Sequence, residues 1–408
     1  MSIDVQLQLK ELELQSLLEV TQAINENADE ADLYKMYKFT LRPNKHISKL
    51  ALYVFDEAWN YKISFGTNKG NEYARITLPN GILECTTETN IEQLEDIGVF
   101  KEFQKVLPVK HKSVILAYIL VSFAKIETFD EDFLMNLENF IEALTNVIIV
   151  AVENKKLARK QQQQEQFKAQ LMLAKNVQQL LFPKKLPYTN TLKIVADYLP
   201  HQTVGGDYYD YILINDHKFL LCIADVSGKG IPAALLMSNF QAALRILVRQ
   251  HLSLKKIIHE LNHLVWLNTQ GESFATAFFM EYDFKTKQMT YVNAGHNPPL
   301  LFQNYLLQEL KEGTTILGSF KELPFVQITE INHIESFFLF CFTDGFTETV
   351  NEQGEEFGSD QLAAFIEAHK HLDQQELHKE LIKVLYQYKG KNEYIDDITL
   401  LSCGVKNN

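Results

Sequence analysis

The sequence contains few cysteines, and none of them is paired. Its four cysteines, Cys85, Cys222, Cys341 and Cys403, lie far apart and form no CxxC pair. Structural zinc sites and disulfide frameworks both need cysteines at short, repeated spacings. We therefore expect neither a zinc site nor a disulfide-stapled fold.

The chain also lacks an excess of positive charge and a long uninterrupted apolar run. Its formal net charge is -13, so it has no general electrostatic attraction for nucleic acid or anionic lipid. The strongest apolar run, Val147 to Val152, is far shorter than the roughly 20 residues that cross a bilayer. The N-terminus has neither a basic region nor a small-residue cleavage site. We expect a cytoplasmic protein that binds neither nucleic acid nor membranes.

The composition is that of a globular protein with more than one core. The chain has 408 residues, of which 46% are hydrophobic and 22% are charged. A single ordinary core seldom extends over so many residues, so two domains and a connector are expected. The predicted boundaries are 1–150 for an N-terminal domain, 151–185 for a helical linker and 186–408 for a C-terminal domain.

A long helix is predicted between the two domains. From Asp130 onward, apolar residues recur at three- and four-residue spacing, and nothing breaks the pattern before Pro183. A helix of this length is typical of a connector or a coiled coil. In a seven-residue frame only five of eight core positions are apolar, which predicts weak pairing into a parallel dimer. A solvated spacer is the alternative.

Three strongly apolar segments in the C-terminal half carry aspartates at their ends. Asp225 lies near the end of KFLLCIADV, Asp344 follows FFLFCF, and Asp396 with Asp397 precedes ITLL. A buried carboxylate without a partner is strongly unfavourable and usually takes up a proton. Because no matching set of arginines or lysines accompanies these aspartates, the pattern favours a divalent cation over salt bridges.

A fourth element, TVGGDYYDY, adds Asp207 and Asp210 beside two glycines. Oxygen ligands alone suit hard cations such as Mg²⁺ or Mn²⁺ rather than zinc or copper. Each aspartate taken singly has a simpler interpretation as a helix cap or a turn residue. Four such elements in one half of the chain favour a metal centre.

Five short motifs together resemble one protein family. The motifs GGDYYD, ADVSGKG, NAGHNPPLL, FTDGFTE and DDITLL occur in this order in the SpoIIE-type phosphatases, a bacterial branch of the protein phosphatase 2C superfamily. The resemblance covers residues 175 to 405. It implies an α+β protein whose C-terminal domain is an α-β-β-α sandwich that holds two Mn²⁺ or Mg²⁺ ions.

The resemblance also implies roles for individual residues. The metal ligands that it implies are Asp207, Asp225, the backbone carbonyl of Val226, Asp344 and Asp396. Asp225 would lie between the two ions. Asp344 and Asp396 would hold one of them, and Asp207 with the Val226 carbonyl would hold the other. Asp225 and Asp344 are the implied catalytic residues. The implied reaction is direct hydrolysis of phosphoserine or phosphothreonine without a phosphoenzyme.

Three further residues are secondary candidates for this site. Asp397 ranks below Asp396, because its position is often asparagine in the wider superfamily. Asp210 is a supporting carboxylate near the ligands. His296 in AGHNPP is a candidate general acid, but a turn role with its side chain bonded to backbone is favoured.

The residue that positions the phosphate is not evident. Lys229 in SGKG is either a phosphate contact or a solvated lysine. The wider superfamily holds the phosphate with an arginine, and no equivalent is obvious in this sequence. Arg245 and Arg249 lie four residues apart on a predicted helix, and we expect both at the surface.

The N-terminal half resembles a GAF-type sensor, with an opening helix, a five- or six-stranded sheet and a long exit helix. No ligand motif accompanies the resemblance, so the alternative is a GAF-shaped dimerisation module that binds no small molecule.

The combined expectation is a signal-regulated protein serine/threonine phosphatase that forms a homodimer through its helical, coiled-coil linker. The family resemblance implies a phosphorylated regulatory protein of the anti-sigma-factor antagonist type as its substrate and partner. The alternative is a non-enzymatic signalling protein that binds its partner through a phosphatase-like domain.

Overall fold

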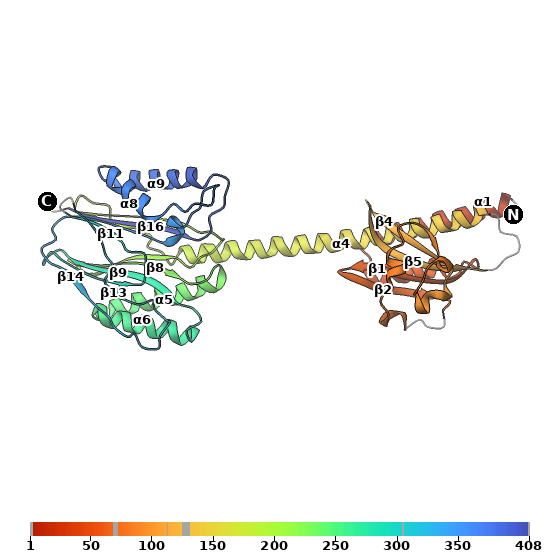
Figure 1. Ribbon diagram of the computed structural model, residues 1–408, viewed down its shortest axis with the longest axis horizontal. Coiled ribbons are helices and arrows are strands. Elements are labelled where there is room, and N and C mark those ends of the chain that lie inside the picture. Colours follow the sequence, from red (N-terminus) through yellow and green to blue (C-terminus); the bar gives the residue numbers. More distant parts are fainter. Residues whose placement is uncertain (1–2, 68–71, 112, 125–130, 304–305, 407–408) are drawn as a thin grey trace. The chain divides into compact units, whose positions relative to one another are not determined.

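The computed structural model describes residues 3–67, 72–111, 113–124, 131–303 and 306–406. The chain divides into two compact units, Met1–Glu165 and Gln166–Asn408 (Figure 1). Each unit has its own hydrophobic cores. A single helix, α4 (Glu131–Gln179), begins in the first unit and ends in the second.

The first unit is built on a five-stranded antiparallel sheet with the strand order β2-β1-β5-β4-β3. Its strands are β1 (Ile47–Asp56), β2 (Ala58–Phe65), β3 (Thr89–Asn90), β4 (Lys105–His111) and β5 (Val114–Phe123). Its other helices are α1 (Ile3–Asn25), α2 (Glu30–Leu41) and α3 (Asn80–Leu83), with 3-10 turns at Tyr73–Arg75, Ile91–Gln93 and Gly98–Glu102.

Both faces of this sheet are buried. Because side chains alternate along a strand, Leu52 of β1 packs with the helices α2 and α4, whereas the next residue, Tyr53, packs on the opposite face. There the hydroxyl of Tyr53 donates to the carbonyl of Tyr73 at 2.9 Å. This second face is filled by the unit's own aromatic side chains, including Phe100.

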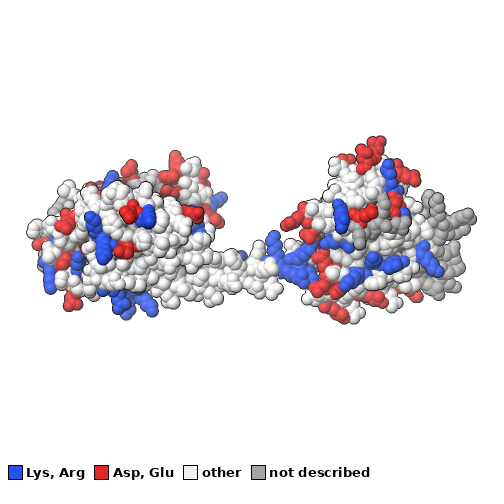
Figure 2. All heavy atoms as spheres, turned by 90° about the horizontal axis from the view of Figure 1, so that it is seen from below, with Lys and Arg blue, Asp and Glu red and all other residues white. Residues whose placement is uncertain are grey.

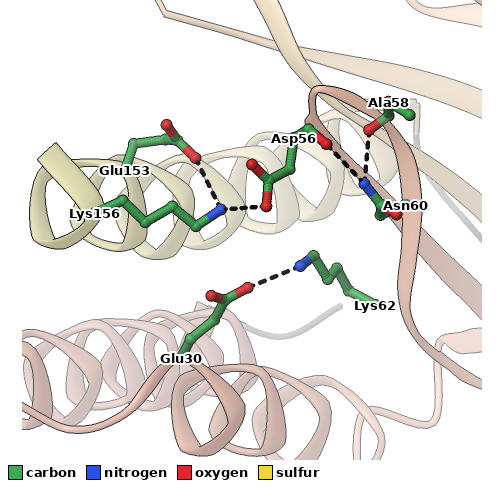
Figure 3. Close-up of polar contacts among 7 residues, drawn as sticks. All are labelled: Glu30, Asp56, Ala58, Asn60, Lys62, Glu153 and Lys156. Atoms are coloured by element: carbon green, nitrogen blue, oxygen red, sulfur yellow. Dashed lines mark hydrogen bonds and ion pairs between the residues drawn. The ribbon is translucent and has the colours of Figure 1, made fainter. Parts of the chain in front are cut away.

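Cations near the middle of α4 fix this helix to the first unit. Lys156 pairs with Asp56 at the end of β1 at 2.7 Å, as Figure 3 shows, and Arg159 lies 3.4 Å from Asp29. Lys155 donates to two backbone carbonyls just beyond α1, those of residues 27 and 28, at 2.9 Å each. The ammonium of Lys155 thus holds the turn that follows α1 against α4.

The second unit contains two sheets. The first has the strand order β13-β10-β9-β8-β7, with β14 also pairing with β10, and the second has the order β12-β11-β15-β16-β6. The strands of the first are β7 (Tyr208–Asn215), β8 (Lys218–Val226), β9 (Ala275–Asp283), β10 (Gln288–Ala294), β13 (Gly313–Thr314) and β14 (Thr329–Ile331). Those of the second are β6 (Leu192–Leu199), β11 (Leu300–Gln303), β12 (Leu306–Glu309), β15 (Phe337–Phe342) and β16 (Ile398–Val405).

Helices cover the outer face of each sheet, which confirms the α-β-β-α sandwich (Figure 1). The helices are α5 (Ile231–Arg249) and α6 (Leu254–Thr269) on the first sheet, α8 (Ser359–His369) and α9 (Gln374–Lys389) on the second, and the short α7 (Asp344–Thr347). Strand β8 is apolar throughout its centre because both of its faces are covered. Its Leu221 packs between the sheets, and its Leu220 packs under α5.

Two helical stretches, residues 132–179 and 231–249, are long and apolar enough to cross a membrane by length and composition. In the second stretch, which is α5, Met237, Phe240 and Leu244 are fully buried. They belong to the core between α5 and the first sheet. Packing on the sheet therefore accounts for the apolar composition of α5.

We predict that Lys155→Met loosens the end of α1. Losing charge-assisted hydrogen bonds of this kind weakens local structure by about 1 kcal/mol, so the amides of residues 22–28 should exchange with solvent about fivefold faster. Hydrogen exchange read by mass spectrometry measures this. Lys160→Met, at an exposed position of the same helix, should leave the exchange unchanged. Equal exchange in both variants would contradict the role of Lys155 in holding the turn that follows α1.

Candidate active site

Four of the predicted aspartates lie at one end of the sandwich. Asp225 is next to last in β8, and Asp207 directly precedes the neighbouring strand β7. In the other sheet, Asp344 follows β15 and Asp396 precedes β16. Antiparallel pairing places the end of one strand beside the start of its neighbour. Each sheet therefore contributes two carboxylates to the same end.

Asp207 ties the two sheets together at this end. Its side chain is 1% exposed, and its Oδ2 accepts hydrogen bonds from Oγ1 of Thr343 at 2.8 Å and Oγ1 of Thr399 at 2.6 Å. Thr343 follows β15 and Thr399 lies in β16, so both donors belong to the opposite sheet. Burial and the charge of Asp225 raise the pKa of Asp207 well above its ordinary value, and the two hydroxyls oppose this shift.

Asp225 is crowded by other carboxylates. Burial, together with the charges of Asp344, Asp396 and Asp397, raises the pKa of Asp225 to about 7. Burial and Asp396 also raise the pKa of Asp344. Shifts of this kind mark carboxylates that are held close together with too little positive charge among them. A cation bound between them would relieve the repulsion.

Asp397 supports the loop that carries Asp207. Its Oδ1 accepts from the backbone N–H of His201 at 2.7 Å, and its Oδ2 accepts from the backbone N–H of Gly206 at 2.8 Å. A Cβ at Gly205 would lie 1.9 Å from Oδ2 of Asp397, so a side chain at that position would displace the carboxylate. Asp397 therefore differs from its neighbour Asp396, because the carboxylate of Asp397 already accepts hydrogen bonds from two backbone N–H groups.

The predicted backbone ligand, the carbonyl of Val226, faces Gly206. A Cβ at Gly206 would lie 2.5 Å from the Val226 oxygen. Because residue 206 is glycine, the space beside this oxygen stays open. Any side chain at this position would fill it.

Lys229 reaches the same group of carboxylates. Its Nζ lies 2.9 Å from Oδ2 of Asp396 and also donates to the backbone carbonyl of Ile395. The side chain of Lys229 is 44% exposed and that of Asp396 is 33% exposed. Lys229 is thus in an ion pair rather than fully solvated.

Asp210 and Arg245 form a separate, buried ion pair on β7 and α5. Arg245 Nε donates to Oδ2 of Asp210 at 2.7 Å and its Nη2 to Oδ1 at 3.1 Å, and the hydroxyl of Tyr208 also donates to Asp210. Asp210 is fully buried. Arg245 lies at the surface as expected, with its side chain 39% exposed, but its guanidinium also reaches the buried carboxylate of Asp210. Asp210 is neutralised by a guanidinium, which leaves it no role as a metal ligand.

His296 is buried in the turn that leads from β10 to β11. The bonds to the turn backbone come from Asn293, whose Oδ1 accepts from His296 N–H at 2.7 Å and whose Nδ2 donates to the His296 carbonyl at 3.0 Å. The imidazole Nδ1 instead lies 2.9 Å from Thr276 Oγ1. Burial lowers the pKa of His296 to about 4, and the nearby carbonyl of Phe342 only partly offsets this. A buried neutral imidazole is poorly suited to protonate a leaving group in solvent.

The four aspartates fit a divalent metal centre in their chemistry, and they lie at the same end of the sandwich without converging on a single point. In the described part of the chain, no three Asp, Glu, His or Cys side chains converge closely enough to hold an ion. The donors are all oxygens, and burial together with neighbouring carboxylates raises the pKa values of Asp207, Asp225 and Asp344. The ammonium of Lys229 already lies on the fourth, Asp396. Oxygen ligands of this kind are those that Mg²⁺ and Mn²⁺ prefer.

Sequence reasoning missed three residues that organise the site. Thr343 and Thr399 hold Asp207, and their only signal is that each lies within two residues of a predicted aspartate. Ser227 fixes the loop after Asp225, because its Oγ accepts from the Phe274 N–H at 2.8 Å and its N–H donates back to the Phe274 carbonyl at 2.9 Å.

Comparisons with known proteins identify the family of the chain. Residues 215–406 match the family model described as Stage II sporulation protein E. The phosphoserine phosphatase RsbU of Bacillus subtilis is 30% identical over 274 residues, which are 66% of this chain and 79% of that protein. The phosphoserine phosphatase RsbP of the same organism is 30% identical over 183 residues, which cover 44% of this chain and 45% of that protein.

A solved structure shows the same fold. The SiaA-PP2C domain of Pseudomonas aeruginosa superposes with a TM-score of 0.53 at 22% identity, covering 60% of this chain and 98% of that one. The sandwich therefore has the PP2C fold. The chain belongs to the SpoIIE-type family of PP2C phosphatases and is a protein serine phosphatase.

We predict that Arg245→Met destabilises the second unit by about 2–3 kcal/mol, because it leaves the buried Asp210 carboxylate without its cation. Arg249→Met is the matched control, since Arg249 is exposed one turn later on the same helix. Calorimetric unfolding of both variants measures the difference. Equal unfolding temperatures would contradict the importance of this ion pair.

Proposed function

We propose that the chain is a metal-dependent phosphatase that removes phosphate from phosphoserine on a regulatory protein of the anti-sigma-factor antagonist type. The observation that carries the proposal is the set of Asp207, Asp225, Asp344 and Asp396 at one end of the sandwich. Burial and the charges of neighbouring carboxylates raise the pKa values of Asp207, Asp225 and Asp344. RsbU and RsbP, the relatives named as phosphoserine phosphatases, support the substrate class.

Two Mn²⁺ or Mg²⁺ ions would occupy this end of the sandwich. Asp225 would lie between them, Asp344 and Asp396 would hold one, and Asp207 with the Val226 carbonyl would hold the other. When bound, such a pair of ions supplies an activated water and neutralises charge on the phosphoryl group.

The chain's own residues fix the geometry around these ions. Thr343 and Thr399 hold Asp207 against the opposite sheet, and Asp397 holds the Gly206 backbone. Because these supports are hydrogen-bonded and buried, Asp207 and the Gly206 backbone need little further ordering when ions bind.

The N-terminal domain of residues 1–150, which lies within the first unit, is proposed to be a GAF-like sensor. It would control the phosphatase domain of residues 186–408. Its five-stranded antiparallel sheet and flanking helices support this proposal. Deleting residues 1–150 should change the metal-dependent rate, measured with a phosphorylated antagonist protein. An unchanged rate would contradict control by this unit.

A cytoplasmic homodimer that pairs through the helical linker, residues 151–185, is also proposed. Apolar side chains on α4 that are more than half exposed support a helical partner; they are Leu157, Phe167, Met172, Leu173 and Val177. Light scattering after size exclusion should give twice the monomer mass. A monomer at high concentration would argue against the dimer.

We predict that Mn²⁺-dependent hydrolysis of a phosphorylated antagonist protein falls at least about 100-fold in Asp225→Asn and in Asp344→Asn, because each change removes a charged ligand. Asp216→Asn, an exposed aspartate in the turn between β7 and β8, should keep the wild-type rate. Phosphate release measures all four proteins. Equal rates in the wild type and both ligand variants would rule out the proposed centre.

A further inference from the structure

Lys229 is placed to act on several carboxylates of the site at once. Its Nζ lies 2.9 Å from Asp396 Oδ2. Its charge also opposes the rise in the pKa of Asp344 that burial and Asp396 cause, and it does the same for Glu348. No other lysine or arginine has a recorded ion pair with the four ligand aspartates in the described part of the chain.

The loop that carries Lys229 is held in place by Ser227, whereas the side chain of Lys229 is partly exposed. Lys229 lies between Gly228, with φ of +96°, and Gly230, with φ of +69°. Two residues earlier, Ser227 is bonded to Phe274 through both its side chain and its backbone. The side chain itself is 44% exposed, and a lysine ammonium on four carbons can change partners at little cost.

Lys229 also borders open space. It lines a pocket of about 770 Å³ in the second unit, together with residues 201–204 and 230–232 and the end of α4. Lys229 therefore contacts the carboxylate of Asp396 and also lines a hollow that is open to solvent.

The ion pair conflicts with metal binding at Asp396. A carboxylate oxygen 2.9 Å from an ammonium is already neutralised, and a dication brought to the same group would be repelled by that ammonium. Lys229 and the ion therefore compete for Asp396. A displaced Lys229 would remain tethered beside the ligands as a free positive charge.

We propose that Lys229 exchanges partners: it neutralises Asp396 in the metal-free protein and binds the substrate's phosphate once a divalent ion has taken Asp396. This inference rests on the metal-dependent function proposed above. It assigns Lys229 as a phosphate-positioning residue. Phosphate oxygens are acceptors that a lysine ammonium binds as a point charge.

The first test is a calorimetric titration of the full chain with Mn²⁺ in the absence of substrate. Lys229→Met should bind Mn²⁺ about fivefold more tightly than the wild type, because a half-exposed ion pair shifts an equilibrium by no more than this. Lys229→Arg keeps the charge and should stay within about twofold of the wild type.

Lys193→Met is the matched control for losing a surface ion pair. Lys193 pairs with Asp373 at 2.6 Å, and their side chains are 29% and 35% exposed. Lys193 lies near the start of β6, whereas the end of β6 pairs with the start of β16 beside Asp396. The Mn²⁺ affinity of Lys193→Met should equal that of the wild type. Thermal unfolding of the variants checks that each is folded.

The second test is binding of inorganic phosphate to the Mg²⁺-saturated protein, also by calorimetry. Lys229→Met should bind phosphate about tenfold more weakly, as expected for one lost charge-assisted contact, and Lys229→Arg should retain binding. Unchanged Mn²⁺ affinity or unchanged phosphate affinity in Lys229→Met overturns the proposed exchange of partners by Lys229. Neither result contradicts the proposed phosphatase function. A wild-type chain that binds no Mn²⁺ overturns the proposed function itself.

Discussion

Repulsion between carboxylates that are brought together at one end of the sandwich is the constraint on which the second unit depends. The two sheets contribute Asp207, Asp225, Asp344 and Asp396 to this end, and burial adds to the unfavourable charge. Buried like charges are tolerated only when donors, protons or cations compensate them. The surrounding hydrogen bonds and the need for cations follow from this single feature.

The compensation comes from groups on both sheets. Thr343 and Thr399 donate to Asp207 across the sandwich, so the most buried carboxylate also joins the sheets. Backbone N–H groups of His201 and Gly206 bind Asp397, and Lys229 binds Asp396. Asp225 is repelled by Asp344, Asp396 and Asp397, which makes it the natural position for a shared ion.

The family resemblance implied the sandwich, and the strand-end aspartates could be found from the sequence because an aspartate beside a wholly apolar strand is conspicuous without any knowledge of the fold. The sequence could not predict the roles of Thr343 and Thr399, since a threonine acquires its partner only when the two sheets stack. The partner of Arg245 could not be predicted for a similar reason. Its carboxylate, Asp210, lies 35 residues earlier, and helical spacing alone says nothing about what lies beneath α5. The aromatic filling of the first unit's sheet likewise depends on contacts between distant segments.

The central claim is that the crowded aspartates form a two-metal centre. A crystal structure of the chain soaked in Mn²⁺, with the ions located by anomalous scattering, tests it most directly. The account predicts two ions about 3.5–4 Å apart, one on each side of Asp225, with Asp344 and Asp396 at one ion and Asp207 with the Val226 carbonyl at the other. Ions bound elsewhere, or none at this end of the sandwich, would contradict it.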